Sequence, residues 1–218
     1  VFLIYGNSIK NEYALDDEIV TSTYDQSNKR IEKGLKGIPK LFSSRYVQTQ
    51  QQNFAYRPLV LTTFAIEYQF FKTNPHISHF LNVLLYSAIC LLLFSILSGL
   101  FSSCNQILPI LAALIFAAHP LHTEVVDSLK NRDELMSFFF GLLSLRFALK
   151  YFDNKNLSSI AASGIFILLA FLSKKTSVIF LPAIPIAVYF FKNIKPSKII
   201  IPVVAIIAAM VIFILIKK

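Results

Sequence analysis

Long apolar runs recur through the second two-thirds of this chain, and they constrain its fold more than any other feature. Several of them approach or exceed the roughly 20 residues that a helix needs to cross a bilayer. Hydrophobic residues make up 55% of the 218 residues, which argues against an ordinary soluble domain. We expect spans over about residues 77–101, 107–118, 134–151, 157–173, 177–191 and 199–216. The sequence therefore predicts an all-α polytopic membrane protein.

The net charge of +9 is consistent with this class. In a membrane protein, Lys and Arg collect in cytoplasmic loops, extend to the interface and contact anionic lipid. We therefore expect membrane lipid as a partner and no nucleic acid. Cys90 lies inside an apolar run and Cys104 in a short loop, so the two cysteines indicate no disulfide framework.

The chain divides into three parts. Residues 1–10 are interpreted as the end of a first transmembrane helix that starts upstream, and no secretory signal peptide is indicated. Residues 11–57 are the one long polar region, expected to be an extracytoplasmic loop that contains short helices. Residues 58–218 are expected to form a helical bundle with about six further spans. Within them, residues 59–71 carry Glu67, which favours a re-entrant or surface helix over a span.

Alternation of the spans sorts the polar segments between the two membrane faces. One face receives residues 11–57, 119–133 and 173–176. The opposite face receives residues 102–106, 150–156 and 192–198. The last two segments are short and rich in Lys, which is typical of the cytoplasmic side. The acids and histidines are therefore expected on the non-cytoplasmic side, although the long loop also carries Lys and Arg.

Three adjacent acids, Asp16, Asp17 and Glu18, follow the first membrane exit. Neighbouring carboxylates near hydrocarbon raise one another's pKa, which suits a general base. The alternative is an acidic cap on a surface helix. From the residues alone both interpretations stay open.

A second polar segment interrupts the apolar runs after mid-chain and contains His119, His122 and Glu124. Charged groups are costly near the centre of a bilayer, so this segment is expected at a membrane surface or in a wet cavity. Histidine and carboxylate are common metal ligands, but the spacing matches no standard zinc pattern. Hydrogen bonding to a sugar or to a general base is the favoured interpretation, and a divalent metal stays open.

Arg132 and Lys174 are candidate ligands for a phosphate. Arg132 is either a bidentate clamp on a phosphate or an interfacial residue paired with Asp133 and Glu134. Lys174 lies beside Lys175 between two spans, where the pair either attracts a lipid phosphate or anchors the membrane edge. The residues alone do not decide between these interpretations.

Short motifs occur along the chain in an order that resembles one known family. They are the acidic motif at 16–18, Tyr56-Arg57-Pro58-Leu59, Asn74-Pro75, His119-Pro120-Leu121-His122-Thr123-Glu124, Asn131-Arg132-Asp133-Glu134-Leu135 and Leu172-Ser173-Lys174. This order is similar to that in the membrane part of the transmembrane-and-tetratricopeptide-repeat proteins. These proteins are O-mannosyltransferase-like members of the glycosyltransferase C superfamily. The resemblance covers nearly all of the chain.

The resemblance implies an integral-membrane glycosyltransferase with a glycosyltransferase C-type helical bundle. Such an enzyme moves a sugar, mannose or another hexose, from a polyprenyl-phosphate carrier to a Ser, Thr or other hydroxyl and inverts the anomeric centre. The transition state would resemble the oxocarbenium ion of glycoside hydrolysis. The implied location is a bacterial cytoplasmic membrane with a site that faces the periplasm, or the endoplasmic reticulum with a luminal site.

The resemblance also implies roles for particular residues. Catalytic roles are expected for Asp16 or Asp17 as the base and for Glu124. Binding of the lipid phosphate and donor is expected from Arg57, Arg132 and Lys174. Positioning of the base or the sugar is expected from Glu18, His119 and His122. No metal ligand and no cofactor is assigned.

The chain departs from the family pattern at Lys175, where the family usually has Glu. The tetratricopeptide repeats of the family are not among these residues, so the chain is expected to be the membrane domain of a longer protein. Two other functions stay open: a polyprenyl-phosphate binding protein or transporter without catalysis, and an inactive scaffold. A transporter should show polar or broken helices at the midplane, whereas here the ionisable groups collect at one surface, which favours an interfacial enzyme.

Overall fold

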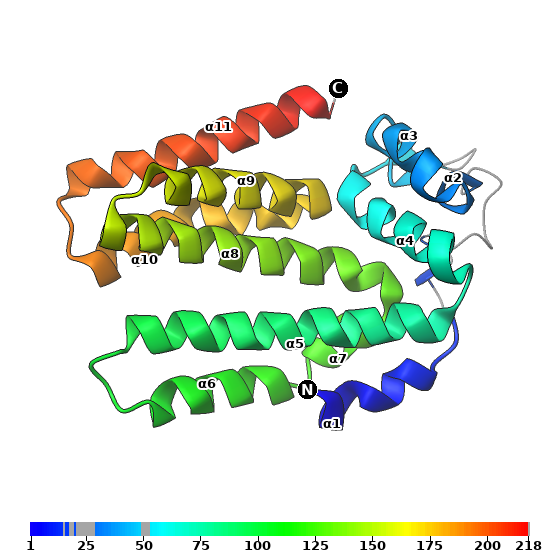
Figure 1. The fold of residues 1–218 in the computed structure, drawn as a ribbon, viewed down its shortest axis with the longest axis horizontal. Coiled ribbons are helices and arrows are strands. Elements are labelled where there is room, and N and C mark those ends of the chain that lie inside the picture. The colour runs from blue at the N-terminus through cyan, green and yellow to red at the C-terminus, as the bar shows by residue number, and fades with distance from the viewer. Residues whose placement is uncertain (15, 18–19, 21–28, 49–52, 218) are drawn as a thin grey trace.

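The computed structural model describes residues 1–14, 16–17, 20, 29–48 and 53–217. Over these residues the chain is mainly a bundle of helices whose axes run roughly side by side (Figure 1). The helices of the bundle are α5 (Pro75–Leu100), α6 (Ile107–Ala118), α8 (Arg132–Asn154), α9 (Leu157–Ser173), α10 (Phe180–Lys192) and α11 (Ile200–Ile216). The expected limits of α6 and α9 are confirmed to the residue.

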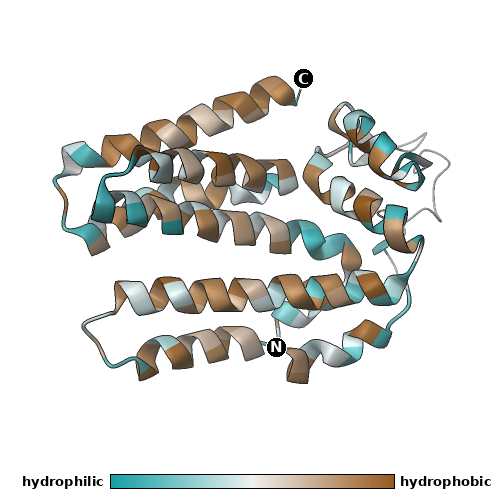
Figure 2. Ribbon diagram, in the orientation of Figure 1, coloured by the Kyte–Doolittle hydropathy of each residue, from teal (hydrophilic) through white to brown (hydrophobic). Residues whose placement is uncertain are grey.

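Four described segments are long and apolar enough to cross a membrane: Pro75–Leu100, Leu129–Asn154, Lys175–Lys192 and Ser197–Ile216. Two shorter apolar helices, α6 and α9, complete the bundle. Large apolar side chains such as Leu91, Ile115 and Phe190 are exposed, as expected where the surrounding solvent is lipid. Figure 2 shows hydrophobic residues over most of these helices. The all-α polytopic membrane fold is confirmed, with four rather than six described segments of spanning length.

Small and polar residues let the helices approach one another inside the bundle. Ser144 of α8 and Ser163 of α9 are buried, and each hydroxyl donates to the other residue's carbonyl at 2.9 Å. Such bonds matter because the hydrophobic effect does little between helices already surrounded by lipid. Gly141 of α8 faces the Phe180 ring so closely that a Cβ there would overlap it. The contact between α8 and α10 at this point therefore requires glycine.

The polar region folds into short elements at one end of the bundle. These elements are α2 (Lys29–Glu32), a 3-10 helix (Gly34–Gly37), α3 (Ile38–Phe42) and the antiparallel two-residue strands β1 (Val47–Gln48) and β2 (Asn53–Phe54). They share an apolar core with α4 (Pro58–Phe71), with Leu129 just before α8 and with Met136 near the start of α8. The short helices expected in this region are confirmed. With 14 residues, α4 is shorter than a span, in agreement with a surface or re-entrant helix.

Shorter connecting elements complete the described chain. They are α1 (Phe2–Tyr5), α7 (His122–Asp127) and 3-10 helices at Gly6–Lys10, Leu129–Asn131, Lys175–Ile179 and Pro196–Ile199.

Proline and asparagine set where helices α4 and α5 begin. Pro58 and Pro75 each open a helix, where the missing N–H has no intrahelical partner to lose. Asn74 caps α5 by accepting a hydrogen bond from the Ile77 N–H at 3.3 Å.

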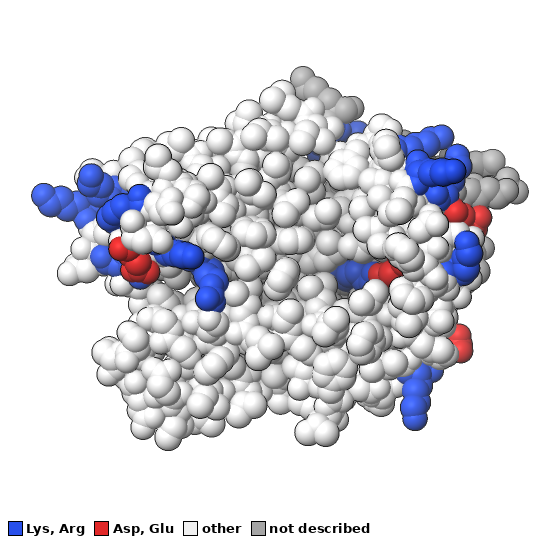
Figure 3. All heavy atoms as spheres, viewed as in Figure 1, with Lys and Arg blue, Asp and Glu red and all other residues white. Residues whose placement is uncertain are grey.

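The polar segments separate to opposite ends of the bundle, as the sequence predicts. The described part of residues 11–57 lies with residues 119–133 and 173–176 at one end, named the motif end. Residues 102–106, 150–156 and 192–198 lie at the other, named the distal end. Figure 3 shows charged side chains gathered toward both ends, with a largely uncharged surface between them. Which side of a membrane each end faces, and the three-part division of the chain, stay predictions.

Candidate functional site

Asp17 ties the polar loop to the segment that precedes α8. It is 2% exposed, and its carboxylate accepts hydrogen bonds from the N–H groups of Ala14 at 3.2 Å and Lys130 at 3.0 Å. The Ser128 hydroxyl donates a further bond at 3.4 Å. Hydrogen bonds to an ionised carboxylate are stronger than neutral ones, so this contact fixes the loop against the bundle.

Asp16, its neighbour, faces outward. Its side chain is 59% exposed, and one carboxylate oxygen pairs with the Lys130 ammonium. An exposed ion pair of this kind contributes little to stability, so the carboxylate can change partners at little cost. Asp16 is therefore accessible to a substrate, whereas Asp17 is committed to holding the loop. Glu18, the third acid of the motif, lies outside the described residues.

A buried carboxylate, Asp133, joins cations from two distant segments. Its side chain is 1% exposed, and it pairs with the Arg57 guanidinium and, at 3.0 Å, with the Lys174 ammonium. The same ammonium lies 2.6 Å from one carboxylate oxygen of Glu134, and the other oxygen of Glu134 accepts a hydrogen bond from the Thr176 hydroxyl at 3.2 Å. Burying an acid is unfavourable unless it is paired in this way. Asp133 is therefore the residue that brings Arg57 and Lys174 together.

Arg57 and Lys174 keep part of their surface exposed. Their side chains are 17% and 14% exposed, respectively. The Arg57 guanidinium also stacks on Tyr46, with 4.6 Å between the guanidinium carbon and the ring centroid. Burial raises the pKa of the Tyr46 hydroxyl, so the ring beneath Arg57 stays neutral. Two cations are thus held at the motif end with an open edge that could receive an anion.

Arg132 is buried instead, with its donors used inside the protein. It is 3% exposed and pairs with the Glu67 carboxylate of α4. Its Nε donates to Asn82 at 2.7 Å, and one terminal nitrogen donates to the Ser78 carbonyl at 2.9 Å. The guanidinium carbon lies 4.0 Å from the centroid of the Phe64 ring. Arg132 therefore connects α4, α5 and α8, and its partner is Glu67 rather than the adjacent acids that the sequence suggested.

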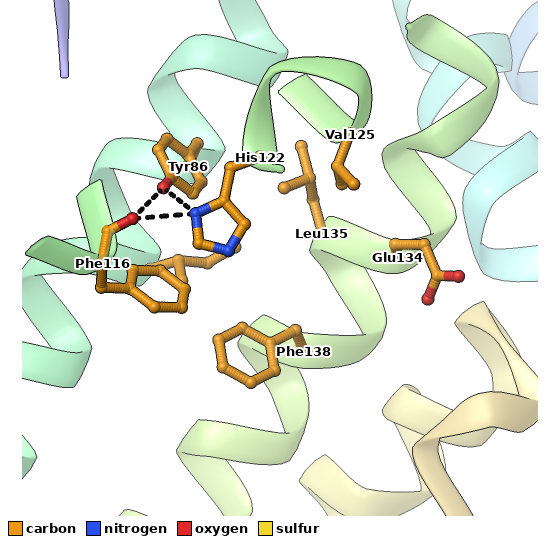
Figure 4. Close-up of a pocket in the computed structure, with 8 residues that line it drawn as sticks. Tyr86, Phe116, His122, Val125, Glu134, Leu135 and Phe138 are labelled. Carbon is orange, nitrogen blue, oxygen red and sulfur yellow. Dashed lines mark hydrogen bonds between the residues drawn. The ribbon is translucent and has the colours of Figure 1, made fainter. Parts of the chain in front are cut away.

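His122 borders a cavity of about 310 Å³ at the motif end (Figure 4). The lining residues are Tyr86, Ile89, Phe116, His122, Val125, Glu134, Leu135 and Phe138. The Nδ1 atom of His122 lies 2.8 Å from both the Phe116 carbonyl oxygen and the Tyr86 hydroxyl. Because the carbonyl can only accept, we assign the proton to Nδ1. The other ring nitrogen of the neutral imidazole is then an acceptor on the cavity side of the ring.

His119 and Glu124 lie on the surface near this cavity. The ring centroids of His119 and His122 are 5.6 Å apart. The His119 Nδ1 accepts the Leu121 N–H at 3.3 Å, and Glu124 lies in the exposed first turn of α7. The described residues contain no group of three His, Cys, Asp or Glu side chains arranged to hold a metal ion. The catalytic role expected for Glu124 and the positioning roles expected for His119 and His122 stay predictions. Whether a divalent metal takes part stays open.

The chain is similar to several proteins named protein O-mannosyl-transferases. It is 34% identical to tmtc2 of Xenopus laevis over 152 residues, which are 67% of this chain and 18% of that protein. It is 34% identical to human TMTC4 over 128 residues, 53% of this chain and 17% of that protein. It is 27% identical to F38B6.6 of Caenorhabditis elegans over 168 residues, 74% of this chain and 23% of that protein.

The chain belongs to the transmembrane-and-tetratricopeptide-repeat (TMTC) family. It spans less than a quarter of the length of these relatives. No protein-family model and no solved structure matches it.

Two features of this TMTC chain were not predicted from its sequence. The first is the partner of Arg132: an acid inside the apolar helix α4, Glu67, was a signal that some buried cation must face it. The second is Asp133, which the sequence suggested only as a partner for Arg132. Lys175, which departs from the family pattern, is exposed and lies beside the Lys174–Asp133 pair without entering it.

Proposed function

We propose that this chain is the membrane part of a glycosyltransferase that moves a sugar from a polyprenyl-phosphate carrier to an acceptor hydroxyl. The observation that carries the proposal is the convergence at the motif end of an exposed acid, Asp16, and two partly exposed cations, Arg57 and Lys174. These three residues come from distant parts of the sequence. The names of the relatives support a hexose donor and a protein acceptor, such as a Ser or Thr side chain.

Asp16 is the proposed catalytic base. Ser and Thr hydroxyls are poor nucleophiles at neutral pH, so the acceptor must lose its proton as it attacks. In the proposed step, the acceptor oxygen bonds to the anomeric carbon while the bond from that carbon to the phosphate oxygen breaks. The proton passes to Asp16. Attack opposite the leaving phosphate inverts the anomeric centre. Asp17 and, by its place in the motif, Glu18 position this base rather than take the proton.

Arg57 and Lys174 are the proposed ligands of the carrier phosphate. The phosphate leaves with its negative charge, so fixed cations stabilise it more as the bond breaks than before. Asp133 holds both cations without covering them. Arg132 has its donors turned inward, so we assign it the task of fixing the first turn of α8, and hence Asp133.

The cavity beside His122 is the proposed place for the sugar. Its volume of about 310 Å³ is within the range of small-ligand sites, and its walls are mostly aromatic and aliphatic. The acceptor nitrogen of His122 would accept a hydrogen bond from a sugar hydroxyl. Glu134 lines the cavity and pairs with Lys174. Exposed His119 and Glu124 would contact the acceptor at the rim. No metal and no cofactor is part of the proposed site.

The motif end is proposed to face the non-cytoplasmic side of the membrane. The distal end carries the short Lys-rich segments 150–156 and 192–198, which are typical of cytoplasmic loops. In a bacterium the site would face the periplasm, and in a eukaryote it would face the lumen of the endoplasmic reticulum.

A non-catalytic polyprenyl-phosphate binding protein is the second candidate. The observation that favours it is Lys175, an exposed cation where the family pattern has an acid. Three neighbouring cations could retain a carrier phosphate whether or not transfer follows. This candidate shares the donor site of the first and differs only in lacking the chemical step.

The test uses the full-length protein in detergent with a set of polyprenyl-phosphate hexoses and a Ser/Thr-rich acceptor peptide. Wild type is compared with Asp16→Asn, with Asp17→Asn and with Glu12→Gln, a matched change to an exposed acid outside the site. We expect Asp16→Asn to lose transfer, on the order of a hundredfold or more, while it retains the donor. Glu12→Gln should transfer as wild type does.

Three other outcomes would change the assignment. Equal transfer by Asp16→Asn and Glu12→Gln would remove Asp16 as the base. Loss in Asp17→Asn alone, with its fold intact, would move the base to Asp17. Donor binding without transfer in the wild type, across all donors and several acceptors, would favour the binding-protein candidate.

A further inference from the structure

We propose that the distal end holds a second site, separate from the motif end, for the phosphate of an anionic phospholipid. The site is a partly open cavity of about 240 Å³ between α5, α8 and α10. Its lining residues are Ser95, Ile96, Gly99, Leu100, Arg146, Leu149, Lys150, Asp153 and Lys192. Three cations and one acid therefore border one small cavity.

Two of these cations lack an acidic partner. Arg146 and Lys150 make no ion pair with any described residue; Arg146 donates to the Ser95 hydroxyl of α5, and Lys150 approaches the Phe147 ring at 5.8 Å. The single acid that lines the cavity, Asp153, forms an ion pair with Lys192. The cavity thus keeps an excess of positive charge.

The spacing of the two unpaired cations makes this excess of positive charge mildly unfavourable without an anion. Arg146 and Lys150 are four residues apart on α8, so their side chains leave the same face of the helix and repel each other. Lys192 faces them from α10 across the cavity. A phosphate seated among the three would convert this repulsion into attraction, and Arg and Lys both bind phosphate well.

The depth of Arg146 also indicates a ligand. It lies eight residues before the end of α8, about 12 Å along the helix, inside a segment of spanning length. Ionisable residues at such positions are rare and mark candidate functional sites. The bond to Ser95 turns the guanidinium across to α5 and toward the cavity, rather than along α8 to its end.

A lipid fits this cavity better than a soluble anion. Ile96, Leu100 and Leu149 form an apolar wall next to the cations, and the neighbouring helix surfaces are apolar and exposed. A phospholipid presents these two chemistries side by side, with its phosphate next to acyl chains. The site is separate from the proposed donor site, because Arg146 lies 14 residues beyond Arg132, about 21 Å along α8.

Gly99 offers a test that leaves every charge in place. A Cβ built at this position meets nothing within 4 Å, so a side chain there enters open space rather than the packed core. Gly99→Leu should therefore keep the helix and obstruct the cavity that Gly99 lines.

The experiment measures lipid retention by native mass spectrometry of the full-length protein in neutral detergent. The probes are dioleoyl phosphatidylglycerol, dioleoyl phosphatidylcholine and inorganic phosphate. The variants are R146Q/K150Q, Gly99→Leu and the control pair K195Q/K198Q, which removes the same charge from the distal end outside the cavity. We expect wild type to retain phosphatidylglycerol over phosphatidylcholine.

R146Q/K150Q should retain phosphatidylglycerol about thirtyfold more weakly, since each basic residue near anionic headgroups contributes roughly fivefold. Gly99→Leu should also lose retention, and K195Q/K198Q should behave as wild type. Equal retention of both lipids would overturn the proposal, as would equal losses in R146Q/K150Q and K195Q/K198Q. Competition by inorganic phosphate at millimolar concentration, with no lipid preference, would make the site one for a soluble anion instead.

Discussion

The two ends of the bundle carry similar basic residues in different surroundings. At the motif end, Arg57, Arg132 and Lys174 each pair with a buried carboxylate from another segment. At the distal end, Arg146 and Lys150 pair with no acid among the described residues. Paired cations join helices to one another and fix the geometry of a site. Unpaired cations that share a cavity can instead be neutralised by an anion that the protein binds.

The largest effect is expected from Arg132→Ala. Removing this side chain leaves the Glu67 carboxylate buried without its cation, and breaking a buried pair costs about 3–5 kcal/mol. Thermal unfolding in detergent, followed by circular dichroism, should show a large loss of stability or no folded protein. A double replacement of Arg132 and Glu67 by Met should lose much less than either single change. If Arg132→Ala unfolds at the same temperature as Lys175→Ala, the pair does not hold the motif end together.

The next effect separates the two adjacent acids. Asp17→Asn removes the charge that accepts hydrogen bonds from Ala14, Ser128 and Lys130, at a cost of about 2 kcal/mol. Asp16→Asn changes an exposed pair and should cost about 0.5 kcal/mol or less. Chemical denaturation of the two variants under identical conditions provides the comparison. Equal losses would mean that burial does not distinguish their roles.

A pH-dependent effect is expected at Asp127, at the end of α7. Burial raises its pKa, although the nearby Ser8 hydroxyl and His79 act in the opposite direction. A raised pKa means that folding favours the protonated acid. Its stabilising contribution is therefore present below the unfolded pKa and is lost as pH rises through the folded pKa.

Asp127→Asn should then gain stability relative to wild type as pH rises from about 4 to 7, because the amide cannot ionise. Melting temperatures of both proteins across this range provide the test. A difference that stays constant, or that shrinks toward neutral pH, would show that the carboxylate is not disfavoured by its burial.

The smallest effect is expected at the distal end. R146Q/K150Q removes two like charges at helical spacing, so stability without anionic lipid should change by about 0.5 kcal/mol or less, with a gain as the expected direction. Melting temperature in neutral detergent is the measurement. A fall as large as that of Arg132→Ala would make Arg146 a structural residue and remove the contrast between the two ends.

The fold was largely predictable because a membrane span is encoded locally. An apolar run predicts the helix that it forms, as the agreement at α6 and α9 shows. Pro58 and Asn74 mark where helices begin. Alternation of the runs then placed the polar segments at the correct ends. The runs at 107–118 and 157–173 are themselves shorter than a full span, and helices α6 and α9 have the same limits as these runs.

The candidate site was predictable in composition but not in pairing. The acids, Arg57 and Lys174 could be selected by residue type and order. Their contacts depend on how α4 and α8 pack, which brings together residues 65 to 76 positions apart, such as Arg132 with Glu67 and Asp133 with Arg57. No pattern within a short stretch of sequence predicts such a contact. The same limit applies to Asp16 and Asp17, which have the same chemistry and adjacent positions but opposite exposure.

One measurement tests most directly whether the two ends bind different ligands. Retention of a polyprenyl-phosphate hexose and of phosphatidylglycerol is measured on the same preparations of wild type, Arg57→Ala and R146Q/K150Q. We expect Arg57→Ala to lose the donor and keep phosphatidylglycerol, and R146Q/K150Q to show the reverse. If either variant loses both ligands in parallel while it stays folded, the two ends form one general anion-binding surface and the assignment of separate sites is wrong.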